Sequence, residues 1–574
     1  HGFNYTPVNL ESQYSPPAGT GSGATITTYA YNLDKQLTTA TRPDGKIVSY
    51  SYDTAGRLIG IVSPDGSLNY TYSANGCPSC SGGEMPQSVA SAIGGVNQTI
   101  NYIYDGAPLT SATWSGAING SVSWTYNNDM LPITQSVNGA NTVNFGYDND
   151  GNLISAGAMT ITRDAGNGNI TATTLGSATT SATYTAYGEL ATSIAKHSAN
   201  TLLNVAYTRD NLGRITRKVE TVQGVATTYD YQYDQAGRLI GVSKNGSAVS
   251  SYVYDNNGNR VTSTVNGVVT QGFYDLQDRL LTYGNNSYTY TANGELLTKS
   301  SASGTTTYNY DVMGNLVSVA MPDGTIIEYV IDGQNRRVGK KVNGVLVQGW
   351  LYKDQLEPIA ELDGAGNVIA TFIYGTKGHS PDYMVKSGVT YRVISDHLGS
   401  PKMIVDIATG AIAQQIDYDE WGNIVSDTNS GFQPFGYVAG IYDSHTKLTR
   451  FGARDYDAET GRWTSKDMMR FEGNSYNLYD YALNDPVNNI DKAGLEAKRI
   501  HPSPIIFPNL YCKCNEVSGL ELIGLEVYTK SGQAEESCRC VYKLKCSDGD
   551  IKIYGPMQPL ICNGCGLQPS GLQG

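Results

Sequence analysis

Apolar and polar positions alternate along most of this chain, and short polar turns interrupt the alternation at regular intervals. Residues 50–58 read YSYDTAGRL, in which Tyr50 and Tyr52 lie two positions apart and so share one face of a strand. Asp53 can accept backbone amides in the following turn, and Gly56 can supply the positive φ that such a turn needs. The unit therefore predicts a strand, a tight turn and the start of a second strand.

Copies of this unit follow one another with a period of about 20 residues, which is typical of repeat architectures. Residues 231–239 and 308–316 are clear copies. Between copies lie second turns of the Pro-Asp-Gly or Asn-Gly type, for example at residues 43–45 and 245–246. Each repeat is thus about one β-hairpin, and a lone hairpin is only marginally stable in water. We therefore predict an all-β fold in which repeated hairpins pair side by side into one continuous sheet.

The aromatic residues are dominated by tyrosine, with 42 Tyr against nine Phe and five Trp. Rows of tyrosines on a sheet are most simply explained by cross-strand packing, where each pair contributes ~0.2–1 kcal/mol. A carbohydrate-binding surface built from the same rings is the alternative interpretation. We prefer the structural interpretation.

Composition and charge exclude several other classes of protein. Hydrophobic residues make up 40% of the chain and charged residues 16%, the reverse of the balance found in disordered chains. The formal net charge of -13, with no cluster of Lys or Arg, argues against nucleic acid as a partner. No apolar run approaches the ~18 residues of a membrane helix, so no membrane span is predicted. Because the chain begins at His1 rather than Met, we expect a signal peptide or a larger region upstream.

Two motif strings near the end of the chain are highly specific. Residues 451–467 read FGARDYDAETGRWTSKD, and residues 477–495 read NLYDYALNDPVNNIDKAGL. Together with residues 395–400 and 418–423, they closely resemble the core-domain signature of the RHS (YD-repeat) family. The resemblance implies a spiral of β-hairpins that forms a hollow shell, closed at one end by a core domain that turns inward as a plug. It divides the chain into an extended lead-in (1–20), a YD-repeat β-shell (21–390), the RHS core domain (391–495) and a variable C-terminal module (496–574).

Family members of this type carry an intramolecular aspartyl protease that cuts after the terminal Asp-Pro-x-Gly-Leu motif. By motif position, the resemblance assigns the two aspartates to Asp467 and Asp491 and the arginine to Arg454. It places the cut between Leu495 and Glu496. Two close carboxylates cannot both ionise cheaply, so one can act as an acid and the other as a base. Because substrate and catalyst share one chain, even a poor catalyst can complete a single turnover.

The sequence departs from the family pattern at Lys492, which replaces Pro, and at Lys466 and Met468, which flank Asp467 in place of Pro. Lys492 frees φ and adds a positive charge beside Asp491, which can displace that carboxylate or favour its ionised form. Considered apart from the resemblance, both aspartates are simply turn-capping residues like those of the repeats.

Seven of the nine cysteines follow Leu495. A Cys-x-Cys pair on a strand points both thiols to one face, so Cys512 and Cys514 are predicted to bond across to Cys538 and Cys540 in a disulfide-stapled β module. Zinc is the alternative for this tail, although the spacings match no standard finger, and we assign no metal site and no cofactor. Because seven is an odd number, one thiol is free or bonds elsewhere. The disulfide candidates are Cys77, Cys80, Cys512, Cys514, Cys538, Cys540, Cys546, Cys562 and Cys565.

The resemblance therefore predicts a bacterial RHS/YD-repeat protein of the secreted polymorphic-toxin type, located outside the cell or at its surface. Its shell would enclose or display its own C-terminal module and release that module by self-cleavage. Other expected partners are an export apparatus, upstream domains or like subunits. The alternative is an uncleaved extracellular structural, filament or adhesion protein whose cysteine-rich tail staples subunits together.

Overall fold

The computed structural model describes residues 1–17, 26–72, 85–473 and 475–499, and the backbone of four strands beyond residue 516. The chain divides into two units, His1–Ile505 and Ile506–Gly574. Among the described residues, no helix is long and apolar enough to cross a membrane. The helices described are short 3-10 turns: η2 (Ile93–Gly95), η3 (Tyr437–Ala439), η4 (Arg470–Gly473) and η5 (Ala482–Asn484).

Forty strands, β1 to β40, form one antiparallel sheet, and each strand pairs with the next along the chain. The path is open, since no pairing between β1 and β40 occurs among the described residues. The prediction of an all-β fold built from repeated hairpins is confirmed, because most consecutive strands of the described sheet are joined by tight turns.

The first twenty strands are β1 (Gly2–Tyr5), β2 (Glu11–Ser15), β3 (Thr27–Tyr31), β4 (Leu37–Thr41), β5 (Ile47–Tyr52), β6 (Leu58–Ser63), β7 (Gly66–Thr71), β8 (Ser88–Ser91), β9 (Gln98–Tyr104), β10 (Leu109–Gly116), β11 (Gly120–Tyr126), β12 (Pro132–Val137), β13 (Ala140–Tyr147), β14 (Leu153–Ala156), β15 (Met159–Arg163), β16 (Ile170–Leu175), β17 (Ala178–Tyr184), β18 (Leu190–His197), β19 (Asn200–Arg209) and β20 (Ile215–Val222). The next twenty are β21 (Val225–Tyr233), β22 (Leu239–Lys244), β23 (Ser247–Tyr254), β24 (Arg260–Val265), β25 (Val268–Tyr274), β26 (Leu280–Tyr283), β27 (Asn286–Tyr290), β28 (Leu296–Ser301), β29 (Gly304–Tyr310), β30 (Leu316–Ala320), β31 (Ile326–Ile331), β32 (Arg337–Val342), β33 (Val345–Tyr352), β34 (Pro358–Asp363), β35 (Val368–Ile373), β36 (Tyr383–Lys386), β37 (Val389–Ser395), β38 (Pro401–Asp406), β39 (Ile412–Tyr418) and β40 (Ile424–Asp427).

Shorter sheets follow. Their strands are β41 (Ile441–Tyr442), β42 (Leu448–Phe451), β43 (Arg454–Asp457), β44 (Arg462–Trp463), β45 (Asn489–Ile490) and β46 (Lys498–Arg499) in the first unit, and β47 (Val517–Thr529), β48 (Glu536–Cys546), β49 (Ile551–Tyr554) and β50 (Gln558–Pro559) in the second.

The long sheet extends past the predicted shell at both ends. The segment 1–20, predicted as an extended lead-in, contains β1 and β2, which pair with each other, and β2 pairs with β3. Asn9 permits the turn between β1 and β2 because it adopts a φ of 61°, which asparagine tolerates. At the other end, strands β37 to β40 continue the sheet beyond residue 390 to Asp427.

A repeated set of contacts joins each hairpin to the next. In the turn after β5, Asp53 Oδ1 accepts the amides of Ala55 and Arg57, both at 2.9 Å, and Oδ2 accepts Arg57 Nε at 2.7 Å. The Arg57 guanidinium lies 4.5 Å from the ring centre of Tyr72, whose hydroxyl donates to the Leu58 carbonyl at 2.9 Å. The same arrangement recurs in the sets Asp210, Arg214, Tyr233 and Asp234, Arg238, Tyr254.

At many strand ends, a tyrosine hydroxyl donates to a carbonyl of the preceding hairpin. Strand β19 ends in Arg209 where many of the other strands end in a tyrosine, and Arg209 Nη1 donates to the Leu190 carbonyl at 2.7 Å. These contacts support the structural interpretation of the tyrosine rows. The other tyrosines that donate in this way are Tyr31, Tyr52, Tyr104, Tyr126, Tyr147, Tyr184, Tyr233, Tyr254, Tyr274, Tyr352 and Tyr374.

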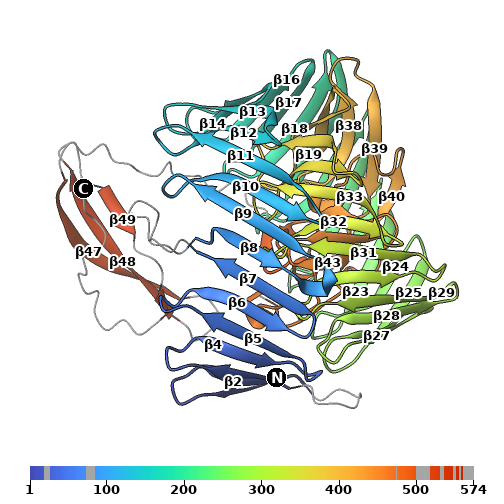
Figure 1. Ribbon diagram of the computed structural model, residues 1–574. Coiled ribbons are helices and arrows are strands. Elements are labelled where there is room, and N and C mark those ends of the chain that lie inside the picture. Colours follow the sequence, from blue (N-terminus) through green and yellow to red (C-terminus); the bar gives the residue numbers. More distant parts are fainter. Residues whose placement is uncertain are drawn as a thin grey trace. The chain divides into compact units, whose positions relative to one another are not determined.

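Strands that are far apart in the sequence face one another. In Figure 1, strands β4 to β11 (blue) stand in one row, and β23 to β33 (green to yellow) stand in a row beside it. Trp114 and Val122 from the first row share a buried core with Trp350 and Leu351 from the second. The repeat pattern determines how neighbouring hairpins pair. This buried core determines which hairpins that are distant in the sequence pack against each other.

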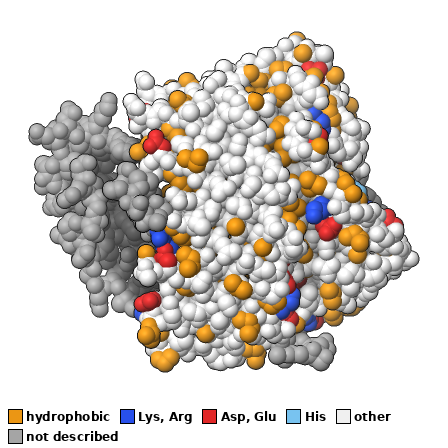
Figure 2. Space-filling model, viewed as in Figure 1, with side chains coloured by type: hydrophobic (Ala, Val, Ile, Leu, Met, Phe, Trp, Pro, Cys, Tyr) orange, Lys and Arg blue, Asp and Glu red, His pale blue; other side chains and the backbone are white. Residues whose placement is uncertain are grey.

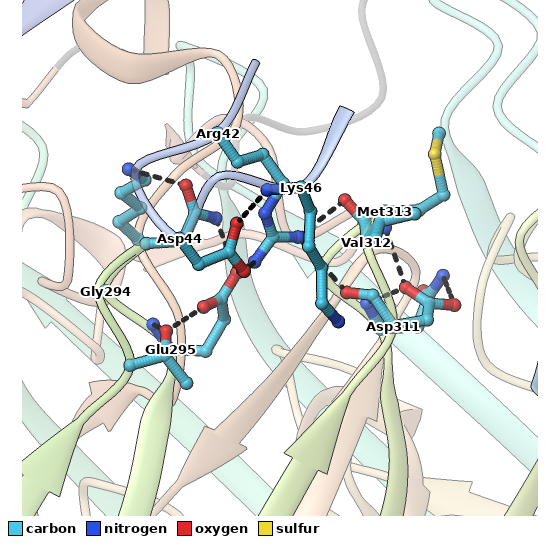
Figure 3. Close-up of polar contacts among 12 residues, drawn as sticks. Arg42, Asp44, Lys46, Gly294, Glu295, Asp311, Val312 and Met313 are labelled. Carbon is cyan, nitrogen blue, oxygen red and sulfur yellow. Dashed lines mark hydrogen bonds and ion pairs between the residues drawn. The ribbon is translucent and has the colours of Figure 1, made fainter. Parts of the chain in front are cut away.

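Arg42, in the turn after β4, links the two rows through polar contacts (Figure 3). Its Nη1 donates to the Val312 carbonyl at 2.7 Å, and its Nη2 lies 3.2 Å from Glu295 Oε1. Asp44 of the same turn also pairs with Arg42, at 3.4 Å. Glu295 is only 2% exposed, and a buried carboxylate is costly unless it is paired, so this contact favours one alignment of the rows.

The surface in Figure 2 carries charged side chains only in scattered spots, in keeping with a charged content of 16%. On that face, Lys and Arg (blue) mostly lie next to Asp or Glu (red), and hydrophobic side chains occur singly or in small groups. This face therefore offers no broad basic surface of the kind that phosphate backbones require.

The tyrosine-to-carbonyl contact predicts a measurable loss of stability. Tyr374 is buried, and its hydroxyl donates to the Pro358 carbonyl at 2.8 Å. Tyr374→Phe should lower the free energy of unfolding by ~1 kcal/mol, because it leaves a buried acceptor unpaired. Tyr187→Phe, at an 89% exposed position, serves as the control in urea denaturation. Equal midpoints for both variants would contradict a structural role for the hydroxyl.

Candidate active site

Arg454 enters the site from the small sheet β41–β44. The turn between β42 and β43 contains Gly452, which has a φ of 41° and lies so close to Ala493 that a β-carbon there would be 2.4 Å from the Ala493 carbonyl oxygen. Ala453 N donates to the same carbonyl at 2.9 Å. The glycine permits this close approach, which brings Arg454, the first residue of β43, against segment 491–495.

The three residues that the resemblance assigns to the protease lie together. Arg454 Nη2 is 2.8 Å from Asp467 Oδ2 and 3.1 Å from Asp491 Oδ2. All three side chains are buried. The guanidinium also lies 4.2 Å from the ring centre of Trp463, which closes one side of the cluster. One cation therefore bridges two carboxylates that lie 24 residues apart in the sequence.

The peptide bond predicted to be cut lies against this cluster. Asp491 Oδ1 accepts the amide of Leu495 at 3.0 Å and the amide of Glu496 at 3.2 Å. Arg454 Nε donates to the Gly494 carbonyl at 2.6 Å. The segment before the bond is thus held by the same two side chains that would act on it.

Gly473 separates Asp467 from the Leu495 carbonyl. A β-carbon on Gly473 would lie 2.8 Å from Asp467 Oδ2 and 3.0 Å from the Leu495 carbonyl oxygen, so both oxygens face the same small space. Arg454, Asp467 and Asp491 line a cavity of about 10 Å³ there, close to the smallest volume that accommodates one water molecule.

Burial raises the pKa of two acidic groups at the site. Burial raises the pKa of Asp467 above its ordinary value, although Arg454 and the Met469 amide, which donates to Asp467 Oδ1 at 2.7 Å, act in the opposite direction. Asp480 lines the same cavity, and burial raises its pKa to about 6. Sequence analysis missed Asp480 because its Tyr-Asp-Tyr setting looks like one more repeat turn.

The departures from the family pattern leave the cluster assembled. Asp491 still pairs with Arg454 although Lys492 follows it. Lys466 Nζ lies 3.4 Å from Asn293 Oδ1, and burial lowers the pKa of Lys466 to about 8. Met468 is exposed.

The segment between the two aspartates is fixed to the long sheet through Asn488. Its Nδ2 donates to both carboxylate oxygens of Asp485, at 2.9 and 3.0 Å, and to the Tyr233 hydroxyl at 2.9 Å. Its Oδ1 accepts the amide of Ile215 at 2.8 Å. Burial raises the pKa of Asp485 to about 6.

The predicted disulfides concern side chains outside the described part of the chain. In the backbone of the second unit, Cys538 pairs with Val527 and Cys540 with Leu525, both in β47. The disulfide pairing and its zinc alternative stay predictions. The side chains concerned are those of Cys77, Cys80, Cys512, Cys514, Cys538, Cys540, Cys546, Cys562 and Cys565.

The fold defines a repeat protein in which β-hairpins form one continuous sheet, to which residues 441–495, here called the core segment, are attached. The family model described as Teneurin YD-shell matches residues 1–487, and the chain belongs to this YD-shell family. The match confirms the resemblance to the RHS/YD-repeat family that the motifs indicated.

Curated relatives include teneurin-4 of Mus musculus, which is 34% identical over 295 residues that cover 49% of this chain and 10% of that protein. The tRNA nuclease WapA of Bacillus subtilis (strain 168) is 27% identical over 274 residues, 46% of this chain and 12% of that protein. The chain therefore spans only about a tenth of the length of these relatives.

Solved structures share the fold. A crystal structure of TcdB2-TccC3-TEV matches with a TM-score of 0.67 and 17% identity, over 85% of this chain and 28% of that chain. A structure of the Photorhabdus luminescens Tc holotoxin pore matches with a TM-score of 0.61 and 16% identity, over 88% of this chain and 31% of that chain.

Asp485 predicts that stability falls as the pH rises. The pKa of Asp485 in the folded chain, about 6, lies above the ordinary value of 3.8. Its stabilising contribution to the free energy of unfolding is therefore complete below pH ~4 and is lost as the pH rises through 6. The loss by pH 8 should be about 2–3 kcal/mol. Asp485→Asn cannot ionise, so its thermal midpoint should fall less between pH 5 and pH 8 than that of the unmodified chain. Asp363→Asn, in an exposed turn, is the control, and parallel curves for all three proteins would refute the assignment.

Proposed function

We propose that this chain is a YD-shell protein of the polymorphic-toxin type that cuts itself between Leu495 and Glu496. The observation that carries the proposal is the bridging of Asp467 and Asp491 by Arg454 directly beside that bond. Turn-capping aspartates, the simpler interpretation, do not require a shared buried arginine. The cut would separate a shell of residues 1–495 from a module of residues 496–574.

The geometry supports a division of labour between the carboxyl groups. Burial raises the pKa of Asp467, which favours its protonated form, and Asp467 would donate that proton to the Leu495 carbonyl oxygen, which lies beside Gly473 as Asp467 Oδ2 does. Asp491 acts as the base that takes a proton from the attacking water. Its Oδ1 lies 3.2 Å from the Glu496 nitrogen, so it can pass that proton to the leaving amine. The water oxygen bonds to the Leu495 carbonyl carbon, the bond to the Glu496 nitrogen breaks, and the proton on the new Leu495 carboxyl group returns to Asp467.

Arg454 would organise the reaction rather than transfer a proton. Its guanidinium offsets the negative charge of the second carboxylate, and its Nε holds the Gly494 carbonyl at 2.6 Å. Because the bond is already held in the site, the entropic cost of binding a substrate is absent, and one turnover suffices.

The same proposal places the protein outside a bacterial cell or at its surface, with the C-terminal module as its cargo. The relationship to WapA, which is named as a tRNA nuclease, and the fold shared with Tc toxin structures support this setting. An export apparatus, upstream domains or like subunits would be its other partners.

Mass analysis under denaturing conditions tests the cut directly. The unmodified chain should give two fragments, residues 1–495 and 496–574, and Asp491→Asn should give one intact chain because the base is lost. Asp457→Asn, at the far end of β43, should still give two fragments. A single chain from the unmodified protein would overturn self-cleavage and favour the uncleaved structural or adhesion protein.

The roles of the carboxyl groups also predict a pH profile for cleavage. Asp467 must be protonated, and its pKa is raised by burial, so the rate should fall as the pH rises through that pKa. The measurement follows fragment formation after cell-free synthesis, with aliquots moved to a series of pH values. A rate that does not change between pH 5 and pH 8.5 would contradict Asp467 as the acid.

A further inference from the structure

The loop that carries Asp467 is held in an unusual conformation. Arg470 has a φ of 52°, in the left-handed region that side chains other than glycine rarely adopt. Its amide donates to the Asp467 carbonyl at 3.2 Å, and η4 then runs to Gly473, which lies against the Asp467 carboxylate. Such strain persists only where surrounding contacts hold it.

Those contacts come from the first strands of the chain. Arg470 Nη1 lies 2.7 Å from Glu11 Oε1 at the start of β2, and Nη2 donates to the Tyr29 hydroxyl of β3 at 2.9 Å. The guanidinium also lies 4.5 Å from the ring centre of Tyr14, a residue that is 2% exposed. One side chain of the catalytic loop is thus held by a carboxylate, a phenol and an aromatic face.

The next residue is held by the same strands. Phe471 meets the ring of His1 edge-on, with 4.8 Å between centroids, and the ring of Phe3 at 6.2 Å. Glu11 and Arg470 are 459 positions apart, so these contacts exist only when the first hairpin lies in place beside the core segment.

The loop also forms part of the cavity beside the bond to be cut. Arg470 and Gly473 line it together with Arg454, Asp467 and Asp491. A movement of the loop would displace the Asp467 carboxylate from Arg454 and from the Leu495 carbonyl. Displacements of about 1 Å can reduce rates about 100-fold.

We infer that Glu11 is a positioning residue for self-cleavage, acting through Arg470 on the loop that carries Asp467. The inference rests on the proposed function. Cleavage then depends on docking of the first hairpin, so the chain is cut only after the N-terminal edge of the sheet has reached the core segment. Glu11 is not among the residues that line the described cavity, so its effect must pass through the loop.

The decisive variant reverses the charge of Glu11 in the full chain. Glu11→Lys should repel Arg470 and slow fragment formation at least tenfold in cell-free synthesis, an effect on the order expected for a misplaced catalytic group. Adding Arg470→Glu restores an ion pair with the signs exchanged and should recover most of the rate. A purely local packing defect would not be rescued by the second substitution.

Asp65→Lys is the matched control. Asp65, in the turn between β6 and β7, pairs with Lys46, in the turn between β4 and β5, at 3.1 Å, and its side chain is 22% exposed against 24% for Glu11. The substitution makes the same charge change without a described contact to the loop, and it should leave the cleavage rate unchanged. Equal slowing by Asp65→Lys and Glu11→Lys would overturn the inference.

Hydrogen–deuterium exchange keeps this test independent of the proposed function. The Met469 amide, bonded to Asp467 Oδ1, should exchange faster in Glu11→Lys and regain protection in the double variant. The cleavage-dead background Asp491→Asn allows this measurement on an intact chain. Unchanged exchange in Glu11→Lys refutes the positioning role even if cleavage occurs, whereas absence of cleavage in the unmodified chain refutes only the proposed function.

Discussion

A hydrogen bond from the tyrosine that ends many of the strands to a carbonyl of the preceding hairpin is the contact on which the alignment of successive hairpins depends. The aspartate turn shifts the register at the end of many strands, as between Gln232 and Tyr233, opposite the carbonyl of Leu239 that begins the neighbouring strand. Tyr254 donates to that carbonyl, at Leu239, while Arg238 lies over its ring. Because buried carbonyls need partners, the hydroxyl makes one alignment of successive hairpins favourable.

The local part of this arrangement could be predicted from the sequence because its components lie within a few residues of one another. Tyr50, Tyr52, Asp53 and Gly56 specify a strand and a turn regardless of the rest of the chain. The meeting of the two rows could not be predicted in this way. Arg42 and Glu295 are 253 positions apart, and nothing in the repeat pattern marks either of them as different from other turn residues.

The candidate site likewise combines residues that the sequence identified with residues that only the fold brings together. Asp467 and Asp491 were identified from the family motif, since locally they resemble the aspartates that cap repeat turns, such as Asp53. Asp480 was missed for that reason. Glu11 was missed because the segment 1–20 lacks the repeat pattern, and only the folded chain brings it to Arg470.

The core segment is attached to many separate hairpins through polar groups. Arg462 contacts Asn259, Asn488 contacts Ile215, Tyr329 contacts Asp443, and Arg337 contacts Asp455. Breaking one member of such a buried set costs more than forming it gains, so the segment fits only when all its partners are present. Every one of these anchors precedes Leu495. Scission at that point would therefore leave all of these contacts within one fragment, so the sheet would keep its attachment to the core segment.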